Sequence, residues 1–121
     1  MARTILVAED SSSIRKFITI ALKMAGYDVV DAVDGMDAIE KMSSQEVDLV
    51  VTDLNMPNVD GFNLIKTIRE NPKNADLPII ILTSLNNERD IREAMEVGAN
   101  SYLIKPFNDK KLLYEISKYL S

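Results

Sequence analysis

Short apolar runs alternate with longer stretches of helical periodicity along the whole chain. The runs lie at residues 4–8, 29–32, 49–52, 79–82 and 102–104 and are rich in aliphatic and β-branched residues. Their length and composition predict five β-strands. The runs at 49–52 and 79–82 do not alternate between apolar and polar positions, which is typical of central strands buried on both faces of a sheet.

The stretches between these runs have one apolar face each. Ile14, Phe17, Ile18, Ala21 and Leu22 are spaced as on one side of a helix. Similar stripes are Ala38, Ile39 and Met42; Phe62, Ile65 and Ile68; Ile91, Ala94 and Met95; and Leu112, Leu113, Ile116, Tyr119 and Leu120. Gly26 and Gly98 follow two stripes, where a left-handed residue ends a helix. Asn108 with Asp109, and Asp60 with Gly61, are placed to begin helices.

Five strands alternating with five helices predict an α/β fold with a parallel sheet covered on both faces. We expect a flavodoxin-like (βα)5 doubly wound five-stranded sheet, strand order 2-1-3-4-5, in one domain over residues 1–121 without an output domain. In that order a ligand site is expected at the carboxyl ends of strands 1 and 3, where the winding direction reverses.

Composition restricts the chemistry that such a site can perform. The 121 residues include no Cys and no His, so thiolate chemistry, disulfides and imidazole catalysis are excluded. The net charge of −5 argues against general nucleic-acid binding. The chain has no apolar run near the roughly 20 residues that span a bilayer. We therefore expect a cytoplasmic protein that binds neither nucleic acid nor membrane.

Polar side chains follow four of the five predicted strands. Glu9 and Asp10 follow the first, Asp53 the third, Thr83 and Ser84 the fourth, and Lys105 the fifth. Carboxylates ~5 Å apart repel by roughly 3 kcal/mol at an effective dielectric of about 20. Lys105 can offset part of this repulsion, and a hard divalent cation such as Mg²⁺ suits the all-oxygen ligands. A carboxylate, Mg²⁺, a lysine and a hydroxyl together predict phosphoryl transfer.

These residues resemble the receiver domains of bacterial response regulators, and the single-domain, CheY-like members most. The resemblance rests on Glu9-Asp10, the segment DLNMPNVDG at 53–61, Thr83-Ser84 and Lys105-Pro106-Phe107, and extends over essentially the whole chain. It implies that Asp53 is the phosphoacceptor and that Mg²⁺ is held by Glu9, Asp10, Asp53 and the backbone carbonyl of Asn55.

The resemblance also implies how the site acts. Thr83 and Lys105 would contact the phosphoryl group, with a cis bond between Lys105 and Pro106. Thr83 and Tyr102 would form the switch that reshapes the face between the fourth and fifth helices. That face would include Asn87, Arg89, Lys110, Lys111, Tyr114 and Lys118.

The function implied is a two-component signalling switch and not a turnover enzyme. A sensor histidine kinase, CheA-like in chemotaxis, would donate the phosphoryl group, and the phosphorylated monomer would bind a protein target such as the flagellar motor switch. Tyr102 favours this role over that of a phosphorelay intermediate.

Two positions depart from the pattern of the family. Glu9 is one methylene longer than the Asp of many relatives, which bears on the metal geometry. Leu85 is apolar where several relatives are polar, which bears on the lifetime of the acyl phosphate.

Other readings of the same residues are a phosphohydrolase, a flavin binder and a scaffold. A haloacid-dehalogenase-type phosphohydrolase needs a second acid two residues after its nucleophile, where Asn55 stands, and a cap. A flavodoxin-like cofactor binder needs a hydroxyl- and glycine-rich phosphate loop, which Glu9 and Asp10 replace with negative charge. The complete acceptor set argues against a pseudo-receiver scaffold. Taken singly, Thr83 fits the end of a strand and Lys105 a surface charge.

Overall fold

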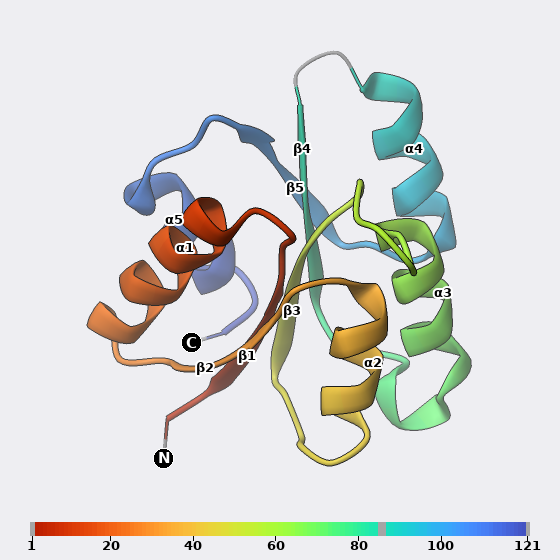
Figure 1. Ribbon diagram of the computed structural model, residues 1–121, viewed down its shortest axis with the longest axis horizontal. Coiled ribbons are helices and arrows are strands. Elements are labelled where there is room, and N and C mark those ends of the chain that lie inside the picture. The colour runs from red at the N-terminus through yellow and green to blue at the C-terminus, as the bar shows by residue number, and fades with distance from the viewer. Residues whose placement is uncertain (1, 85–86, 121) are drawn as a thin grey trace.

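The fold is a parallel sheet with helices on both faces, as a computed structural model describes it for residues 2–84 and 87–120 (Figure 1). The strands are β1 (Thr4–Ala8), β2 (Asp28–Ala32), β3 (Leu49–Asp53), β4 (Ile79–Ser84) and β5 (Ser101–Lys105). The helices are α1 (Ser12–Met24), α2 (Gly35–Met42), α3 (Gly61–Glu70), α4 (Glu88–Val97) and α5 (Asp109–Ser117), with a short 3₁₀ turn η1 (Pro72–Asn74) after α3.

The strand order is β2-β1-β3-β4-β5, and every neighbouring pair is parallel. This confirms the predicted flavodoxin-like topology. β1 and β3 lie side by side with Ala8 opposite Thr52, so the residues that follow them emerge next to each other. The winding reverses between these two strands, which places a crevice at their carboxyl ends.

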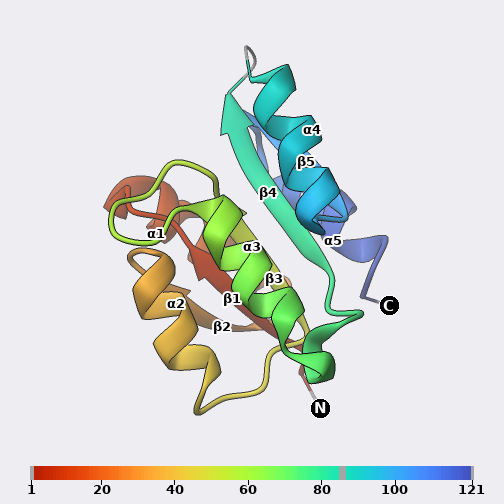
Figure 2. The same cartoon turned by 90° about the vertical axis from the view of Figure 1, so that its right-hand side faces the viewer.

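Helices α1 and α5 cover one face of the sheet, and α2, α3 and α4 cover the other (Figures 1 and 2). Successive residues of a strand point to opposite faces, so Ile5 and Val7 pack under α1 while Leu6 and Ala8 pack under α2 and α3. Every residue of β3 is buried, and so are the first five residues of β4. This confirms that these strands are central.

The ends of the elements agree with the local sequence, with small differences. Gly26 and Gly98 have φ angles of 96° and 131°, the left-handed conformation expected at a helix end. Side chains of Asp60 and Asn108 cap α3 and α5. Strands β2 to β5 are one or two residues longer than predicted, because ladder pairing continues through polar residues such as Asp53 and Lys105.

Among the described residues, no helix has the length and apolar character to span a membrane.

Candidate functional site

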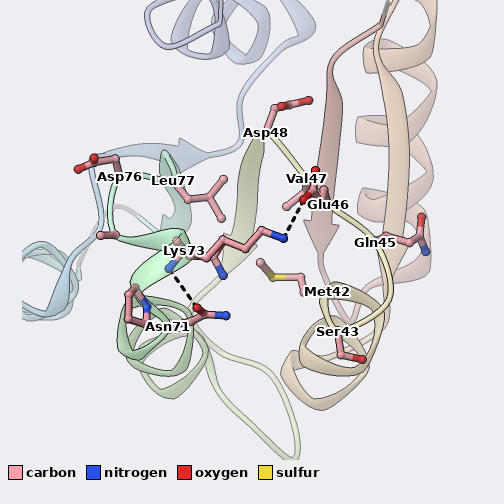
Figure 3. A pocket seen from close by; sticks show the side chains of 13 residues that line it. Met42, Ser43, Gln45, Glu46, Val47, Asp48, Asn71, Lys73, Asp76 and Leu77 are labelled. Atoms are coloured by element: carbon pink, nitrogen blue, oxygen red, sulfur yellow. Dashed lines mark hydrogen bonds and ion pairs between the residues drawn. The ribbon is translucent and has the colours of Figure 1, made fainter.

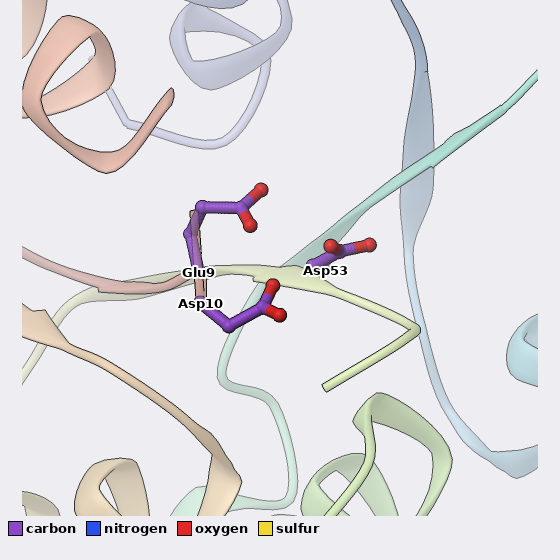
Figure 4. Close-up of side chains that lie close together, drawn as sticks. All are labelled: Glu9, Asp10 and Asp53. Atoms are coloured by element: carbon purple, nitrogen blue, oxygen red, sulfur yellow. The ribbon is translucent and has the colours of Figure 1, made fainter. Parts of the chain in front are cut away.

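Three carboxylates meet at the carboxyl edge of β1 and β3. Glu9 and Asp10 follow β1, and Asp53 ends β3. One carboxylate oxygen of each lies within 4.8 Å of one oxygen of each of the others (Figure 4). The parallel pairing of the two strands brings together residues more than forty positions apart, as the sequence predicted.

The three carboxylates differ in burial. The side chain of Glu9 is fully buried, Asp53 is 7% exposed, and Asp10 is exposed. Burial raises the pKa of Glu9 above its usual 4.5, and the charge of Asp53 adds to that rise. Hydrogen bonds from Ser11 and Lys105 stabilise the ionised form of Glu9 and offset part of it. The site therefore concentrates negative charge at a place where water solvates it poorly.

Lys105 bridges the two buried carboxylates. Its Nζ donates to Glu9 Oε1 at 3.0 Å and to Asp53 Oδ2 at 3.1 Å. Burial by itself lowers the pKa of Lys105, but the hydrogen bonds and charges of Glu9 and Asp53 outweigh it, so the pKa lies above 10.5. The following bond to Pro106 is cis, as the resemblance to receiver domains implied. Lys105 thus offsets the repulsion between Glu9 and Asp53 by contacting both carboxylates.

The backbone around Glu9 is fixed by two contacts that the sequence analysis did not identify. The Ser11 N–H donates to Glu9 Oε2 at 3.0 Å, and Arg15 Nη1 donates to the Glu9 carbonyl at 2.8 Å. Ser11 also caps α1 through the Ile14 N–H. A Ser before a helical stripe is a recognisable cap signal, but nothing local marks Arg15, whose reach depends on how α1 packs on the sheet.

The loop from Asp53 to α3 carries Asn55 past the carboxylates. The Asn55 N–H lies 3.4 Å from Asp53 Oδ1. Farther along, Asn58 has a φ of 67° and donates from Nδ2 to Asp34 Oδ2 at 2.7 Å. A Cβ on Gly61 would collide with the carbonyl of Asp53, so the loop returns close to its starting strand. These contacts hold Asn55 at the edge of the carboxylate cluster.

Thr83 lies at the end of β4, one residue after the partner of Asp53 in the β3–β4 ladder. It is 2% exposed, and its Oγ1 accepts a hydrogen bond from Asn87 Nδ2 at 3.3 Å. Asn87 also donates to Ser84 Oγ at 2.9 Å. The sequence placed Asn87 on a surface for partners, but its side chain is half-buried and turned toward β4. Leu85 lies outside the described residues.

Tyr102 lies on β5 and is 44% exposed. Its ring therefore faces solvent at the edge strand in this structure. The other residues expected on that face, Arg89, Lys110, Lys111, Tyr114 and Lys118, are also exposed. Four of these five side chains are basic.

The donor atoms gathered at the strand ends fit a hard cation. Glu9, Asp10 and Asp53 offer carboxylate oxygens, and Asn55, whose carbonyl the resemblance implied as a further ligand, lies in the adjoining loop. Oxygen ligands with several carboxylates are the set that Mg²⁺ and Ca²⁺ prefer. The residues thus suit the metal that the sequence predicted.

A second hollow lies at the opposite edge of the sheet and has a different character. It is lined by residues of the α2–β3 and α3–β4 connections (Figure 3). Lys73 Nζ pairs with Glu46 Oε1 at 2.7 Å across it, and the Lys73 N–H donates to Asn71 Oδ1 at 3.0 Å. Both members of this ion pair are largely exposed, whereas Glu9 and Asp53 at the carboxyl edge of β1 and β3 are buried. The hollow is therefore a weaker candidate for a functional site.

Comparison with known proteins agrees with this geometry. Residues 5–117 match the model of the response regulator receiver domain. The chain is 40% identical over 116 residues to "Probable transcriptional regulator ycf27" of Porphyridium aerugineum, which covers 96% of this chain and 47% of that protein. It is 36% identical to "DNA-binding dual master transcriptional regulator RpaA" of Synechocystis sp., covering 96% of this chain and 48% of that protein. The chain thus spans about half the length of these curated relatives.

Solved structures resemble the fold closely. The chemotaxis protein CheY4 of Vibrio cholerae is 34% identical, with a TM-score of 0.94 over 99% of this chain and 100% of that one. The receiver domain of sensor histidine kinase PA1611 from Pseudomonas aeruginosa, with magnesium in its active-site cleft, is 28% identical, with a TM-score of 0.90 over 98% of both chains. By its sequence match, its topology and its carboxylate site, the chain belongs to the response regulator receiver domain family.

Proposed function

We propose that this receiver domain accepts a phosphoryl group on Asp53 from a histidine kinase and thereby changes its affinity for a protein partner. The observation that carries the proposal is the contact of Lys105 Nζ with Glu9 and Asp53 at 3.0 and 3.1 Å, inside a cluster of three carboxylates. A buried nucleophilic carboxylate, a cation beside it and a cation-binding oxygen set are the parts that acyl phosphate formation needs.

Each residue has a defined task in this proposal. A carboxylate oxygen of Asp53 attacks phosphorus, the phosphorus–nitrogen bond of the donor phosphohistidine breaks, and the imidazole leaves with the electron pair. Lys105 stabilises negative charge on the phosphoryl oxygens, and the Thr83 hydroxyl donates a hydrogen bond to one of them. Glu9, Asp10, Asp53 and the Asn55 carbonyl would hold Mg²⁺. When bound, this ion supplies positive charge for the phosphoryl oxygens.

The direct test is intact mass after incubation with acetyl phosphate. Wild type should gain one phosphoryl group in Mg²⁺ and none in excess chelator, while Asp53→Asn should gain none in either. Asp60→Asn, which alters an acid at the start of α3, is a matched control and should behave as wild type. Phosphorylation of Asp53→Asn to the wild-type level would refute the assignment of the acceptor.

A turnover assay on small phosphate esters separates a switch from a phosphohydrolase. As a switch, the chain should show no multiple turnover of small phosphate esters, because its only proposed covalent chemistry is formation and loss of its own acyl phosphate. Sustained release of inorganic phosphate from such esters, lost in Asp53→Asn, would favour the phosphohydrolase.

Two outputs remain candidates for the phosphorylated form. The likeness to CheY4 and the exposed Tyr102 support a cytoplasmic, monomeric messenger in chemotaxis that binds the flagellar motor switch. The curated relatives, named as transcriptional regulators and about twice as long, support control of transcription. A purified motor switch protein that binds only the phosphorylated chain would favour the first. Phosphorylation-dependent pairing of two copies, without such binding, would favour the second.

A further inference from the structure

Helix α4 begins differently from the other described α-helices. The side chains of the cap residues of α1, α2, α3 and α5 each accept a hydrogen bond from the third residue of their helix; these caps are Ser11, Asp34, Asp60 and Asn108. Asn87 stands at the same place before α4 and is of a residue type strongly favoured there. However, its side chain makes no cap bond to α4.

The Asn87 side chain is used for a contact with β4 instead. Its Nδ2 donates to Thr83 Oγ1 at 3.3 Å and to Ser84 Oγ at 2.9 Å. Its backbone angles, φ −109° and ψ 40°, also differ from the extended angles of the other four cap residues. The residue that should cap α4 is thus bonded to the hydroxyl of Thr83, which follows the ladder partner of Asp53 on β4.

The opposite end of α4 is fixed. Arg69 of α3 donates from Nε and Nη2 to the carbonyl of Gly98, at 3.1 and 2.7 Å. Arg69 Nη2 also reaches Asn100 Oδ1 at 3.0 Å, and that oxygen accepts from the Ile79 N–H at 2.8 Å. The C-terminal end of α4 is therefore tied to α3 and β4, so a change near Thr83 acts on the first turn of the helix.

We propose that Asn87 is a positioning residue that couples the Thr83 hydroxyl to the first turn of α4. While Thr83 accepts from Asn87, α4 lacks its side-chain cap. The bond is near the upper limit for a hydrogen bond, so movement of the hydroxyl toward a phosphoryl group on Asp53 breaks it. With only its contact to Ser84 Oγ left on β4, the Asn87 side chain then turns away from Ser84, accepts from the Asp90 N–H and caps α4. The arrangement of Asn87 in the phosphorylated protein rests on the proposed function, whereas its arrangement in the unphosphorylated protein is the one observed.

The coupling is testable without phosphorylation, by removing the acceptors on β4. Thr83→Val with Ser84→Ala leaves Asn87 free to cap, so exchange of the Asp90 amide hydrogen should slow by ~5-fold, the effect of a cap of about 1 kcal/mol. Adding Asn87→Ala to this pair should abolish the slowing, whereas adding Asn87→Ser, which caps but is shorter, should retain it. Amide exchange by NMR on the full chain measures each case, and urea unfolding shows whether each variant is folded.

Equal exchange at Asp90 in the double variant with and without Asn87→Ala would overturn the coupling. So would exchange that stays at the wild-type rate when both acceptors are removed. In wild type, phosphorylation confirmed by mass in the same sample should slow Asp90 exchange by a similar factor, and unchanged exchange in fully phosphorylated protein would also refute the proposal. Absence of any added phosphoryl group would instead refute the role of Asp53, and the acceptor variants would still decide the role of Asn87.

Discussion

Replacement of Lys105 by Met tests whether the site is held together by charge. Lys105 Nζ is the cation nearest to two buried carboxylates, at 3.0 Å from Glu9 and 3.1 Å from Asp53. At an effective dielectric of about 20, each such contact is worth ~5.5 kcal/mol before the groups are desolvated. Desolvation and lost lysine rotamers cancel most of this attraction, and removing one partner of a buried pair costs roughly 3–5 kcal/mol.

Because 25% of the Lys105 side chain is exposed, we expect the lower end of that range. Lys105→Met should reduce the free energy of unfolding by about 3 kcal/mol at pH 7 in chelator, measured by urea unfolding with circular dichroism. Lys110→Met removes the same charge from an exposed position on α5 and should change it by less than about 0.5 kcal/mol.

The pH dependence identifies the group responsible. In the folded protein the pKa of Glu9 lies above its unfolded value of 4.5, so ionising Glu9 costs more when folded than when unfolded. Stability from this group is therefore greatest below pH 4.5 and is lost as pH rises through the folded pKa. Without Lys105 the pKa of Glu9 rises further, so at pH 5 more of the Glu9 carboxyl is protonated and uncharged than at pH 7. The loss in free energy of unfolding caused by Lys105→Met should therefore be smaller at pH 5 than at pH 7.

A second substitution decides whether Lys105→Met loses stability because the buried Glu9 carboxylate is left without its cation. Adding Glu9→Gln to Lys105→Met should recover at least half of the lost stability, because the glutamine carries no charge to leave unpaired. A deficit that is the same at both pH values and is not recovered by Glu9→Gln would refute the electrostatic explanation and indicate lost packing of the lysine stem.

Three further changes probe the scaffold around the site. Gly35→Ala should lower the free energy of unfolding by about 1–3 kcal/mol in urea, because its Cβ would collide with the Val59 carbonyl. Asp34→Ala should destabilise the protein at pH 7, because hydrogen bonds from the first turn of α2 and from Asn58 in the loop after β3 lower the pKa of Asp34. Thermal unfolding at several pH values should show the difference in stability between wild type and Asp34→Ala decreasing as pH falls below 3.8. Arg69→Met should speed amide exchange at the C-terminal end of α4 more than at its start, because Arg69 binds the Gly98 carbonyl.

The sequence alone was sufficient for the fold and for the composition of the site. Strand and helix positions follow from residue periodicity, because burial on one or both faces imposes a spacing of two or 3.6 residues. The left-handed ends at Gly26 and Gly98 and the cap at Asn108 follow from local backbone chemistry. The placement of acids after β1 and β3 followed from the strand order, since parallel strands deliver their carboxyl ends to one edge.

Only the tertiary structure decided how these groups are paired. The complete burial of Glu9, its shared lysine with Asp53 and the support from Arg15 depend on how far each side chain reaches across packed elements. The engagement of Asn87 with Thr83, in place of the cap that its residue type predicts, depends on where α4 sits relative to β4. Local sequence sets which hydrogen bonds a side chain can make, but competition between partners is resolved only when distant elements are brought together.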